Sequence, residues 1–288
     1  MHFVQAKTIL TPHSMNIYRG CSHGCIYCDS RSKCYQFTHE FEDIEVKQNA
    51  PELLEETLRK KRKRCMIGTG SMCDPYIPLE KELGLMRRCL KIIERHNFGV
   101  APLTKSDLIL RDIDILDRIN QKAKTVVQMT LTTADDELCR KVEPGVCPTS
   151  RRFEVLCECR DRNIPTVVWL SPFLPFINDT KENIDVLLDY CIRAKVKAII
   201  CFGIGLTLRE GNREYFYAAL DRNFPNTGLK ERYIKTFGYS YMCSSPYEHE
   251  LMKHIATVCR QHNIMFGTDS IFKWMEEFPE NKLQSELF

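Results

Sequence analysis

Three cysteines near the start of the chain, Cys21, Cys25 and Cys28, stand in the pattern C-x3-C-x2-C. This spacing is compact enough for three thiolates to face one inorganic centre. A [4Fe-4S] cluster normally takes one thiolate per iron, so three cysteines leave one iron open to a further ligand. The spacing by itself therefore favours a cluster whose open iron can bind a cofactor.

Two other uses of these thiols stay open at this point. A structural zinc site would need a fourth ligand, for which His13, His23 and Cys34 are the nearby candidates. A redox dithiol would need only Cys25 and Cys28, and it would leave the first cysteine without a role.

The chain has fifteen cysteines in 288 residues. An odd number in a chain of this size is a poor match to the disulfide framework of a small secreted domain. Most of the remaining thiols stand at apolar positions of helical or strand patterns and are expected to be buried core residues, as at Cys89, Cys191, Cys201 and Cys259. Since Met1–Lys7 shows no secretory signal, we expect a cytoplasmic protein.

Composition is that of an ordinary globular chain, with 43% hydrophobic and 27% charged residues. Lys and Arg number 41 and Asp and Glu 38, so the formal net charge is +3. The longest apolar stretches, residues 164–177 and 198–206, are too short to cross a bilayer. These values exclude a disordered, collagenous or coiled-coil chain, and they predict no membrane span.

Short apolar runs alternate with amphipathic helical stretches along most of the chain. Strands are expected before Cys21 and near residues 65–68, 98–102, 125–130, 164–170 and 197–204. About six such β-then-α units build a parallel sheet covered by helices, which favours a (β/α) barrel or partial barrel. Catalytic groups of these barrels collect where the strands end, and the residues that follow the strands here are unusually polar.

The last part of the chain has the pattern of an accessory cap. Ser245–Glu248 has the sequence of a capping box with a proline at the first helical position, and an apolar stripe follows it. No linker or low-complexity tract precedes it. We therefore expect residues 241–288 to be an extension packed on residues 1–240.

One dense basic run covers Arg59–Arg64. Clustered cations favour a phosphate backbone because they release its counterions. The run also ends a helical stretch that begins with acidic residues, the order that a helix dipole prefers. We favour a solvated helix end over a nucleic-acid contact.

The cysteine motif, with the aromatic Tyr27 before its third cysteine, resembles the signature of radical S-adenosylmethionine (SAM) enzymes. Further stretches are similar, in order and spacing, to the branch related to spore photoproduct lyase, often labelled DNA repair photolyase. The similarity covers roughly residues 18–224, and its stretches are Asn16–Cys21, Val46–Ala50, Asp74–Tyr76, Thr104–Asp107 and Glu143-Pro144. The resemblance implies a partial (β/α)6-type radical SAM barrel with a C-terminal helical extension.

The resemblance also implies a mechanism. Cys21, Cys25 and Cys28 would hold three irons of a [4Fe-4S] cluster, and the amino and carboxylate groups of SAM would chelate the fourth. Reductive cleavage of SAM would then give a 5′-deoxyadenosyl radical that abstracts a hydrogen atom, while the protein orients the reactants and excludes water. An electron donor such as flavodoxin or ferredoxin is an implied partner, and nucleic acid is a candidate partner. The sequence does not identify the oligomeric state.

Three further residues are candidates for binding SAM. Lys105 supplies a cation at a strand end, where the resemblance implies a lysine near SAM; the alternative is a surface lysine beside a helix. Thr132 can hydrogen-bond the SAM carboxylate or ribose, or it can cap the next turn, and Thr130 or Thr133 can serve instead. Tyr27 is expected beside the cluster and adenine, although an ordinary buried tyrosine gives the same pattern.

Cys73 is the candidate catalytic residue. Spore photoproduct lyase returns a hydrogen atom to the repaired thymine from a cysteine just ahead of a Ser-Asp pair. When Asp74 is taken as the aspartate of that pair, Cys73 stands at the serine and Ser71 at the donor cysteine. Two roles stay open: a thiol facing SAM or substrate, or a semi-buried core cysteine.

The expected function is hydrogen abstraction by a radical SAM enzyme, with lyase-type repair of a nucleic-acid lesion as the leading reaction. The alternatives are modification of a small molecule or a peptide by the same chemistry, or a non-catalytic nucleic-acid-binding protein with a structural metal site.

Overall fold

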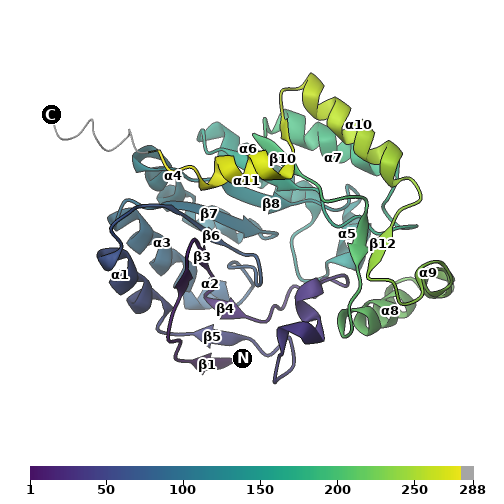
Figure 1. Cartoon of the computed structure of the whole chain (residues 1–288), viewed down its shortest axis with the longest axis horizontal. Coiled ribbons are helices and arrows are strands. Elements are labelled where there is room, and N and C mark those ends of the chain that lie inside the picture. Colours follow the sequence, from purple (N-terminus) through teal and green to yellow (C-terminus); the bar gives the residue numbers. More distant parts are fainter. Residues whose placement is uncertain (280–288) are drawn as a thin grey trace.

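The computed structural model describes residues 1–279, and its centre is a large, mostly parallel sheet (Figure 1). The sheet has the order β13-β10-β9-β8-β7-β6-β3-β2. Neighbours are parallel from β3 to β13, and only β2 is antiparallel to its partner. Its strands are β2 (Leu10–Thr11), β3 (Ser14–Met15), β6 (Met66–Thr69), β7 (Gly99–Thr104), β8 (Val127–Thr130), β9 (Thr166–Trp169), β10 (Ala198–Ile200) and β13 (Met265–Phe266).

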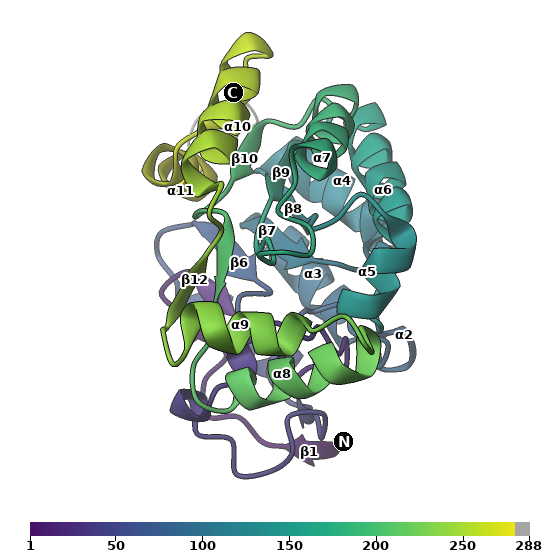
Figure 2. The ribbon, with the colours of Figure 1, turned by 90° about the vertical axis from the view of Figure 1, so that its right-hand side faces the viewer.

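Helices connect these parallel strands and cover the outer side of the sheet (Figure 2). They are α1 (Ala50–Lys60), α2 (Glu80–Leu83), α3 (Leu85–Arg95), α4 (Ile113–Lys122), α5 (Asp136–Val142), α6 (Thr149–Asp161) and α7 (Lys181–Arg193). The strands predicted from apolar runs are confirmed, with β3 as the strand ahead of the cysteines. Because β2 and β13 are the sheet's edges, the barrel is partial, as expected for six β/α units.

Two smaller sheets flank the main one. The first has the order β1-β5-β4, with β1 (His2–Val4) parallel to β5 (Glu45–Lys47) and β4 (Tyr18–Arg19) antiparallel to it. The second pairs β11 (Gly205–Thr207) with β12 (Met242–Ser244). The chain between these two strands forms α8 (Asn212–Asn223) and α9 (Leu229–Phe237).

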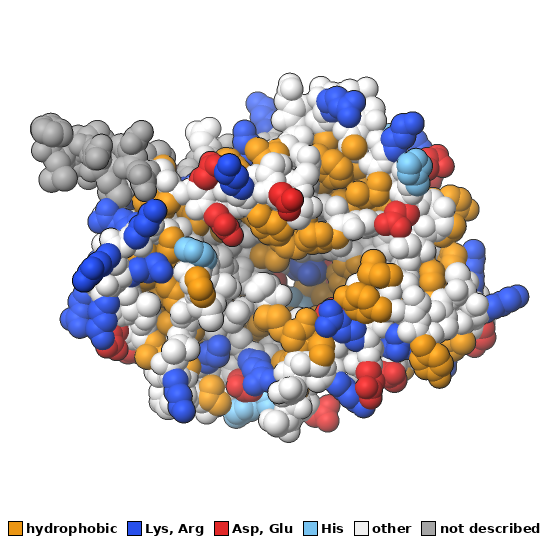
Figure 3. All heavy atoms as spheres, in the orientation of Figure 1, with side chains coloured by type: hydrophobic (Ala, Val, Ile, Leu, Met, Phe, Trp, Pro, Cys, Tyr) orange, Lys and Arg blue, Asp and Glu red, His pale blue; other side chains and the backbone are white. Residues whose placement is uncertain are grey.

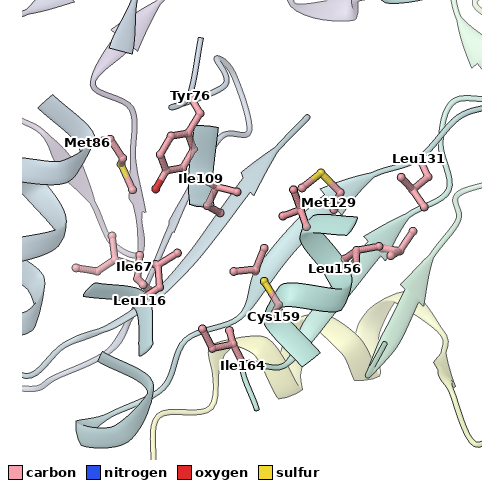
Figure 4. Close-up of a cluster of buried hydrophobic side chains, with 14 of the residues drawn as sticks. Ile67, Tyr76, Met86, Ile109, Leu116, Met129, Leu131, Leu156, Cys159 and Ile164 are labelled. Atoms are coloured by element: carbon pink, nitrogen blue, oxygen red, sulfur yellow. The ribbon is translucent and has the colours of Figure 1, made fainter. Parts of the chain in front are cut away.

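The core lies between the main sheet and its helices. Figure 4 shows Ile67 of β6 beside Leu116 of α4, and Met129 of β8 near Leu156 and Cys159 of α6. All five side chains are fully buried. The strands are buried on both faces and so consist of nearly continuous apolar residues. Full burial of one such side chain stabilises the fold by about 1.5–3 kcal/mol.

The C-terminal segment contains β12, α10 (Glu248–Gln261), β13 and α11 (Thr268–Glu276). It adds a strand to each of two sheets, since β12 pairs with β11 and β13 pairs with β10. Residues 280–288, the end of the extension expected from the sequence, lie outside the described residues.

The capping box expected at Ser245 is wrong in detail. The α10 helix begins at Glu248, and the Ser245 hydroxyl accepts from the Tyr247 N–H at 3.1 Å instead of capping the helix. It also donates to Asp179 Oδ2 at 2.5 Å. The hydroxyl therefore uses both of its roles, accepting locally from Tyr247 and donating to a buried carboxylate of a distant loop.

Residues 1–279 contain no helix that is long and apolar enough to cross a membrane. The basic run divides at the end of α1, where Lys60 closes the helix and residues 61–64 lead into β6. It therefore lies at the amino end of the strand, on the side opposite the polar strand ends.

Candidate functional site

The cysteine loop, residues 20–28, follows β4 and is held from two sides. On the first side, the Cys21 N–H donates to the Phe41 carbonyl at 3.2 Å. Gly20 makes this approach possible, because its φ is +86° and a Cβ there would lie 2.5 Å from the Phe41 oxygen. Only glycine adopts this conformation at so close a contact without strain.

The second side of the cysteine loop lies against residues 142–145, after α5. The Ile26 N–H donates to the Val142 carbonyl at 3.0 Å, and the Gly145 N–H donates to the His23 carbonyl at 2.8 Å. These bonds explain physically why Glu143-Pro144 and the cysteine motif, more than a hundred residues apart, belong to one site.

All fifteen cysteines are free thiols, and within the loop Cys25 is buried while Cys21 and Cys28 are partly buried. In the described part of the chain, no group of three ligand atoms within 4.8 Å of one another includes these cysteines. Tetrahedral zinc would bring thiolate sulfurs to about 3.8 Å from each other, given Zn–S bonds of about 2.3 Å. At least one pair of these sulfurs is therefore farther apart than in a preformed tetrahedral zinc site.

Two of the three fourth ligands considered for zinc, His23 and Cys34, have other contacts, and the third, His13, is exposed. His23 has Nε2 3.0 Å from Asp74 Oδ2 and Nδ1 3.1 Å from the Gly145 carbonyl. Cys34 is exposed and accepts from Arg209 Nη1 at 3.3 Å. The donor set therefore remains three thiols, the number that leaves one iron of a [4Fe-4S] cluster open.

Asp74 links the loop after β6 to the end of β7. Its carboxylate accepts from the Thr104 hydroxyl at 2.7 Å, the Lys105 N–H at 2.7 Å and the Tyr76 N–H at 2.8 Å. Burial raises the pKa of Asp74, but the His23 charge and these hydrogen bonds outweigh it, so the pKa lies below the usual value. A fixed carboxylate thus sets the backbone position of Lys105.

The Lys105 side chain projects from the carboxyl end of β7 toward the cysteine loop. Burial lowers its pKa, but electrostatic interactions with Cys25, Glu143 and Asp74 outweigh burial, so the pKa of Lys105 lies above its ordinary value. Among residues 1–279, no carboxylate lies within 4 Å of its Nζ as an ion-pair partner. A partly buried cation with no direct partner is suited to hold an anionic group of a ligand.

Tyr27 belongs to a buried ion-pair assembly. Its hydroxyl donates to Glu143 Oε1, and Arg152 Nη2 donates to Glu143 Oε2 at 2.5 Å. Both charged side chains are 0% exposed. Burial raises the pKa of Glu143, but Arg152 and Lys105 outweigh it and hold that pKa below its ordinary value. Tyr27 is therefore anchored through its hydroxyl, not only packed as an apolar residue.

Thr132 follows β8, and its backbone is hydrogen-bonded while its side-chain hydroxyl is not. Its backbone carbonyl accepts from Asn178 Nδ2 at 2.7 Å and Asn183 Nδ2 at 3.2 Å. The Thr132 hydroxyl is fully buried, yet it has no hydrogen-bond partner in the structure. The alternative Thr133 already accepts from the Asp135 N–H at 3.4 Å. Since buried hydroxyls are normally paired, the orphaned one at Thr132 fits a ligand contact.

Cys73 is buried in the loop after β6, beside the cysteine loop. The Cys73 thiol donates to the Asp74 carbonyl at 3.5 Å. Its proximity is the largest cause that lowers the pKa of the Cys21 thiol to about 6, and Cys21 in turn raises the pKa of Cys73. The structure therefore brings together the cysteines, Cys73, Lys105 and Tyr27. The thiol of Cys73 faces a cysteine of the motif.

Sequence reasoning missed Arg152, gave Glu143 and Asp74 no role in the site beyond the motifs that contain them, and considered His23 only as a fourth zinc ligand. Arg152 had a detectable signal, because it occupies the apolar face of α6 with Val155, Leu156 and Cys159 at helical spacing. A charged residue on such a face indicates a buried partner. The orphaned hydroxyl of Thr69, at the end of β6, had no comparable signal.

Comparison with known proteins identifies a family and several similar proteins for this chain. The radical SAM superfamily model matches residues 15–191. An uncharacterised protein of Mycobacterium tuberculosis is 28% identical over 263 residues, covering 88% of this chain and 75% of its own. An uncharacterised protein of Methanocaldococcus jannaschii is 30% identical over 187 residues, covering 62% of this chain and 69% of its own.

Solved structures of spore photoproduct lyase have the same fold. One variant superposes with a TM-score of 0.65 at 13% identity, covering 90% of this chain and 78% of that one. Another, with bound AdoMet and dinucleoside spore photoproduct, gives 0.62 at 12% identity, covering 86% and 73%. The fold is thus that of the spore photoproduct lyase-like branch. With a family model that spans well over half of its length, the chain belongs to the radical SAM superfamily.

Proposed function

We propose that Cys21, Cys25 and Cys28 hold a [4Fe-4S] cluster whose open iron binds SAM, and that the enzyme abstracts a hydrogen atom from its substrate. When bound, the cluster and SAM supply an electron and a 5′-deoxyadenosyl radical. The observation that carries the proposal is the set of three thiols beside a charged, unpartnered Lys105. Membership of the superfamily supports an enzyme that uses SAM and an iron–sulfur cluster.

The chain's own residues have separate tasks in this proposal. Lys105 binds the carboxylate of SAM. The hydrogen bond from its backbone N–H to Asp74 fixes the backbone from which the lysine side chain extends. The free hydroxyl of Thr132 takes a second polar group of SAM, either the carboxylate or the ribose. Tyr27, held by Glu143, lines the site beside the cysteines and helps to exclude water.

The substrate class that we propose is a nucleic-acid lesion, processed by lyase-type chemistry. The shared fold with spore photoproduct lyase is one support. The other is the face in Figure 3, which has a hollow near its middle with hydrophobic side chains at the rim. Exposed aromatic residues lie after β10, at Phe202, and on either side of β12, at Tyr241 and Tyr247, and such rings can stack on bases.

Arginines accompany these aromatic residues. Arg209 stacks on Tyr241 with its guanidinium carbon 4.9 Å from the ring centre, and Arg213 lies 5.7 Å from the ring centre of Tyr239. A cation next to a stacking ring serves a phosphate backbone. The basic run at residues 59–64 is not part of this surface, because it precedes the amino end of β6.

For Cys73 we propose a place in the lining of the SAM pocket, since its thiol faces Cys21. Cys73→Ser keeps the side chain's size and hydrogen-bonding capacity but removes the weak S–H bond. We expect this variant to cleave SAM and give the same product as the parent. Aberrant or incompletely quenched product from Cys73→Ser would instead identify the thiol as the hydrogen donor.

The cluster is tested by anaerobic reconstitution. Cys21→Ala, Cys25→Ala and Cys28→Ala should each lose the cluster and SAM cleavage, whereas Cys34→Ala should keep both. Iron content and 5′-deoxyadenosine are the measurements. A triple cysteine variant that retains four irons would refute the assignment and leave a structural metal site as the explanation.

The substrate is tested with the same 5′-deoxyadenosine assay. A damaged oligonucleotide should increase SAM cleavage over the undamaged strand, and the damaged base should be altered. Stimulation by a peptide or a small molecule, with none by the oligonucleotide, would move the proposal to the alternative substrate classes.

The proposal includes an electron donor such as flavodoxin or ferredoxin. It also includes a cytoplasmic location, supported by fifteen free thiols, which persist in reducing compartments.

A further inference from the structure

A second group of metal-ligating side chains lies apart from the cysteine loop, in and beside the small sheet of β1, β5 and β4. His2 of β1, His39 of the preceding loop and Glu45 of β5 each offer one donor atom, and these atoms lie within 4.8 Å of one another. In residues 1–279 this is the one group of three or more metal-ligating side chains that meets that distance. Three separate segments of chain therefore bring their donors to one point.

Hydrogen bonds orient both imidazole rings at this point. His39 Nδ1 lies 2.9 Å from the Glu40 carbonyl, and His2 Nδ1 lies 2.9 Å from Asp43 Oδ2. A histidine that binds a metal usually donates its other ring N–H to a carbonyl or carboxylate, which fixes the tautomer. Each ring is thus held by Nδ1 and has Nε2 left for a ligand, and His39 Nε2 already lies 2.9 Å from Glu45 Oε1.

We propose that His2, His39 and Glu45 bind one Zn²⁺ ion, with water completing the coordination. Two imidazoles and one carboxylate form a ligand set that zinc accepts in proteins. The side chains are 41%, 17% and 17% exposed, so the ion can enter from solvent and keep a water ligand. No residue of the cysteine loop takes part, so this site is independent of the proposed cluster.

Two nitrogen donors, from Arg19 and His39, now contact the Glu45 carboxylate, and a bound zinc ion would take that place. Arg19 Nη1 lies 3.4 Å from the same Glu45 oxygen that His39 contacts. Arg19 has other partners, since its Nη2 donates to the carbonyls of Tyr35 and Gln36. Zinc binding releases the Nε2 proton of His39 and leaves Arg19 with those two carbonyls.

The position of the site gives it a structural task. His39 and Phe41 are in the same loop, and the Phe41 carbonyl accepts the hydrogen bond from the Cys21 N–H. A zinc ion would tie this loop to β1 and β5, and it would therefore stiffen the segment that supports the start of the cysteine loop.

The test uses the full-length, cluster-loaded protein dialysed against Zn²⁺, with bound zinc and iron measured in the same samples. One zinc per chain is expected for the parent, and none for His2→Ala, His39→Ala or His39→Gln. Asp43→Asn should weaken zinc binding about 10- to 100-fold, because it removes the group that orients His2. Zinc should raise the melting temperature of the parent and leave that of the His39 variants unchanged.

His96→Ala is the matched control. His96 Nε2 lies 2.7 Å from Glu55 Oε1, so it repeats the histidine–glutamate pair without a second histidine. This variant should keep its zinc and its affinity. Zinc retained by both His39 variants, equal loss in His96→Ala, or sulfur ligands in the zinc X-ray absorption spectrum would each overturn the proposal.

Discussion

Two buried assemblies with the same chemical composition hold the two ends of the cysteine loop. At the entry, Tyr18 Oη donates to Glu80 Oε2 at 2.5 Å and Arg111 Nη2 donates to Glu80 Oε1 at 2.6 Å. Within the loop, Tyr27 and Arg152 bind the two oxygens of Glu143 in the same way. Each assembly places a tyrosine hydroxyl and a guanidinium on one fully buried glutamate.

The surroundings of the two glutamates differ. Arg111 is 25% exposed and also pairs with Asp112, which Arg87 shares, so the Glu80 assembly has further charges at its edge. Arg152 is 0% exposed. Glu143 raises the pKa values of Cys25 and Lys105, whereas Glu80 is not among the main causes of either shift. Both buried Tyr–Glu–Arg groups thus hold the backbone on which the cysteine loop depends. The neighbouring residues decide whether such a group also shifts the pKa values of residues in the site.

The largest difference is expected from removing the guanidinium. Arg152→Met removes the hydrogen-bonded cation from the buried Glu143 and should cost about 3–5 kcal/mol of unfolding free energy. Arg111→Met should cost clearly less, because that site is partly exposed and Arg87 remains beside Asp112. Anaerobic urea unfolding of the cluster-loaded chains measures both, and equal losses would show that exposure does not separate the two assemblies.

The next difference concerns charge near the cluster. Glu143→Gln removes a negative charge that acts on Cys25, so the cluster's midpoint potential should rise by on the order of tens of millivolts, given about 59 mV per tenfold change for one electron. Glu80→Gln should leave the potential unchanged. Redox titration followed by EPR gives both values, and the same shift in both variants would mean that Glu143 has no special place.

The smallest effect is expected from the hydroxyls. Tyr27→Phe and Tyr18→Phe each remove one donor from a buried carboxylate, which should cost about 1–3 kcal/mol in either case. Only Tyr27→Phe should also weaken SAM binding, since Tyr27 lies within the cysteine loop. Calorimetric titration with SAM distinguishes them; weaker binding in Tyr18→Phe would show that the loop responds as one unit.

Local patterns were sufficient for the main architecture. The continuous apolar runs of β6 to β9 and the stripes of α3, α4 and α7 at helical spacing depend only on neighbours along the chain. Ser106 is a local cap of the same kind: its hydroxyl accepts from the Leu108 N–H at 3.2 Å at the start of a 3-10 helix. The cysteine spacing is likewise local and needs no fold to be recognised.

Partners that are distant in sequence were decided by tertiary structure. The carboxylate that accepts from the Ser245 hydroxyl, that of Asp179, lies 66 residues away and had no local signal. Cys73 was identified as interesting, but its contact with Cys21 depends on how the loop after β6 lies against the cysteine loop.

The sequence alone thus determined the alternation of strands and helices and the three-thiol motif, because both depend on short-range spacing. Only the tertiary structure decided that Glu143 pairs with Arg152 inside the site, that the Thr132 hydroxyl is left without a partner, and that His2 meets His39 and Glu45. The physical reason is that burial and charge pairing depend on which side chains the folded backbone brings within a few ångströms, and no periodicity along the chain encodes those distances.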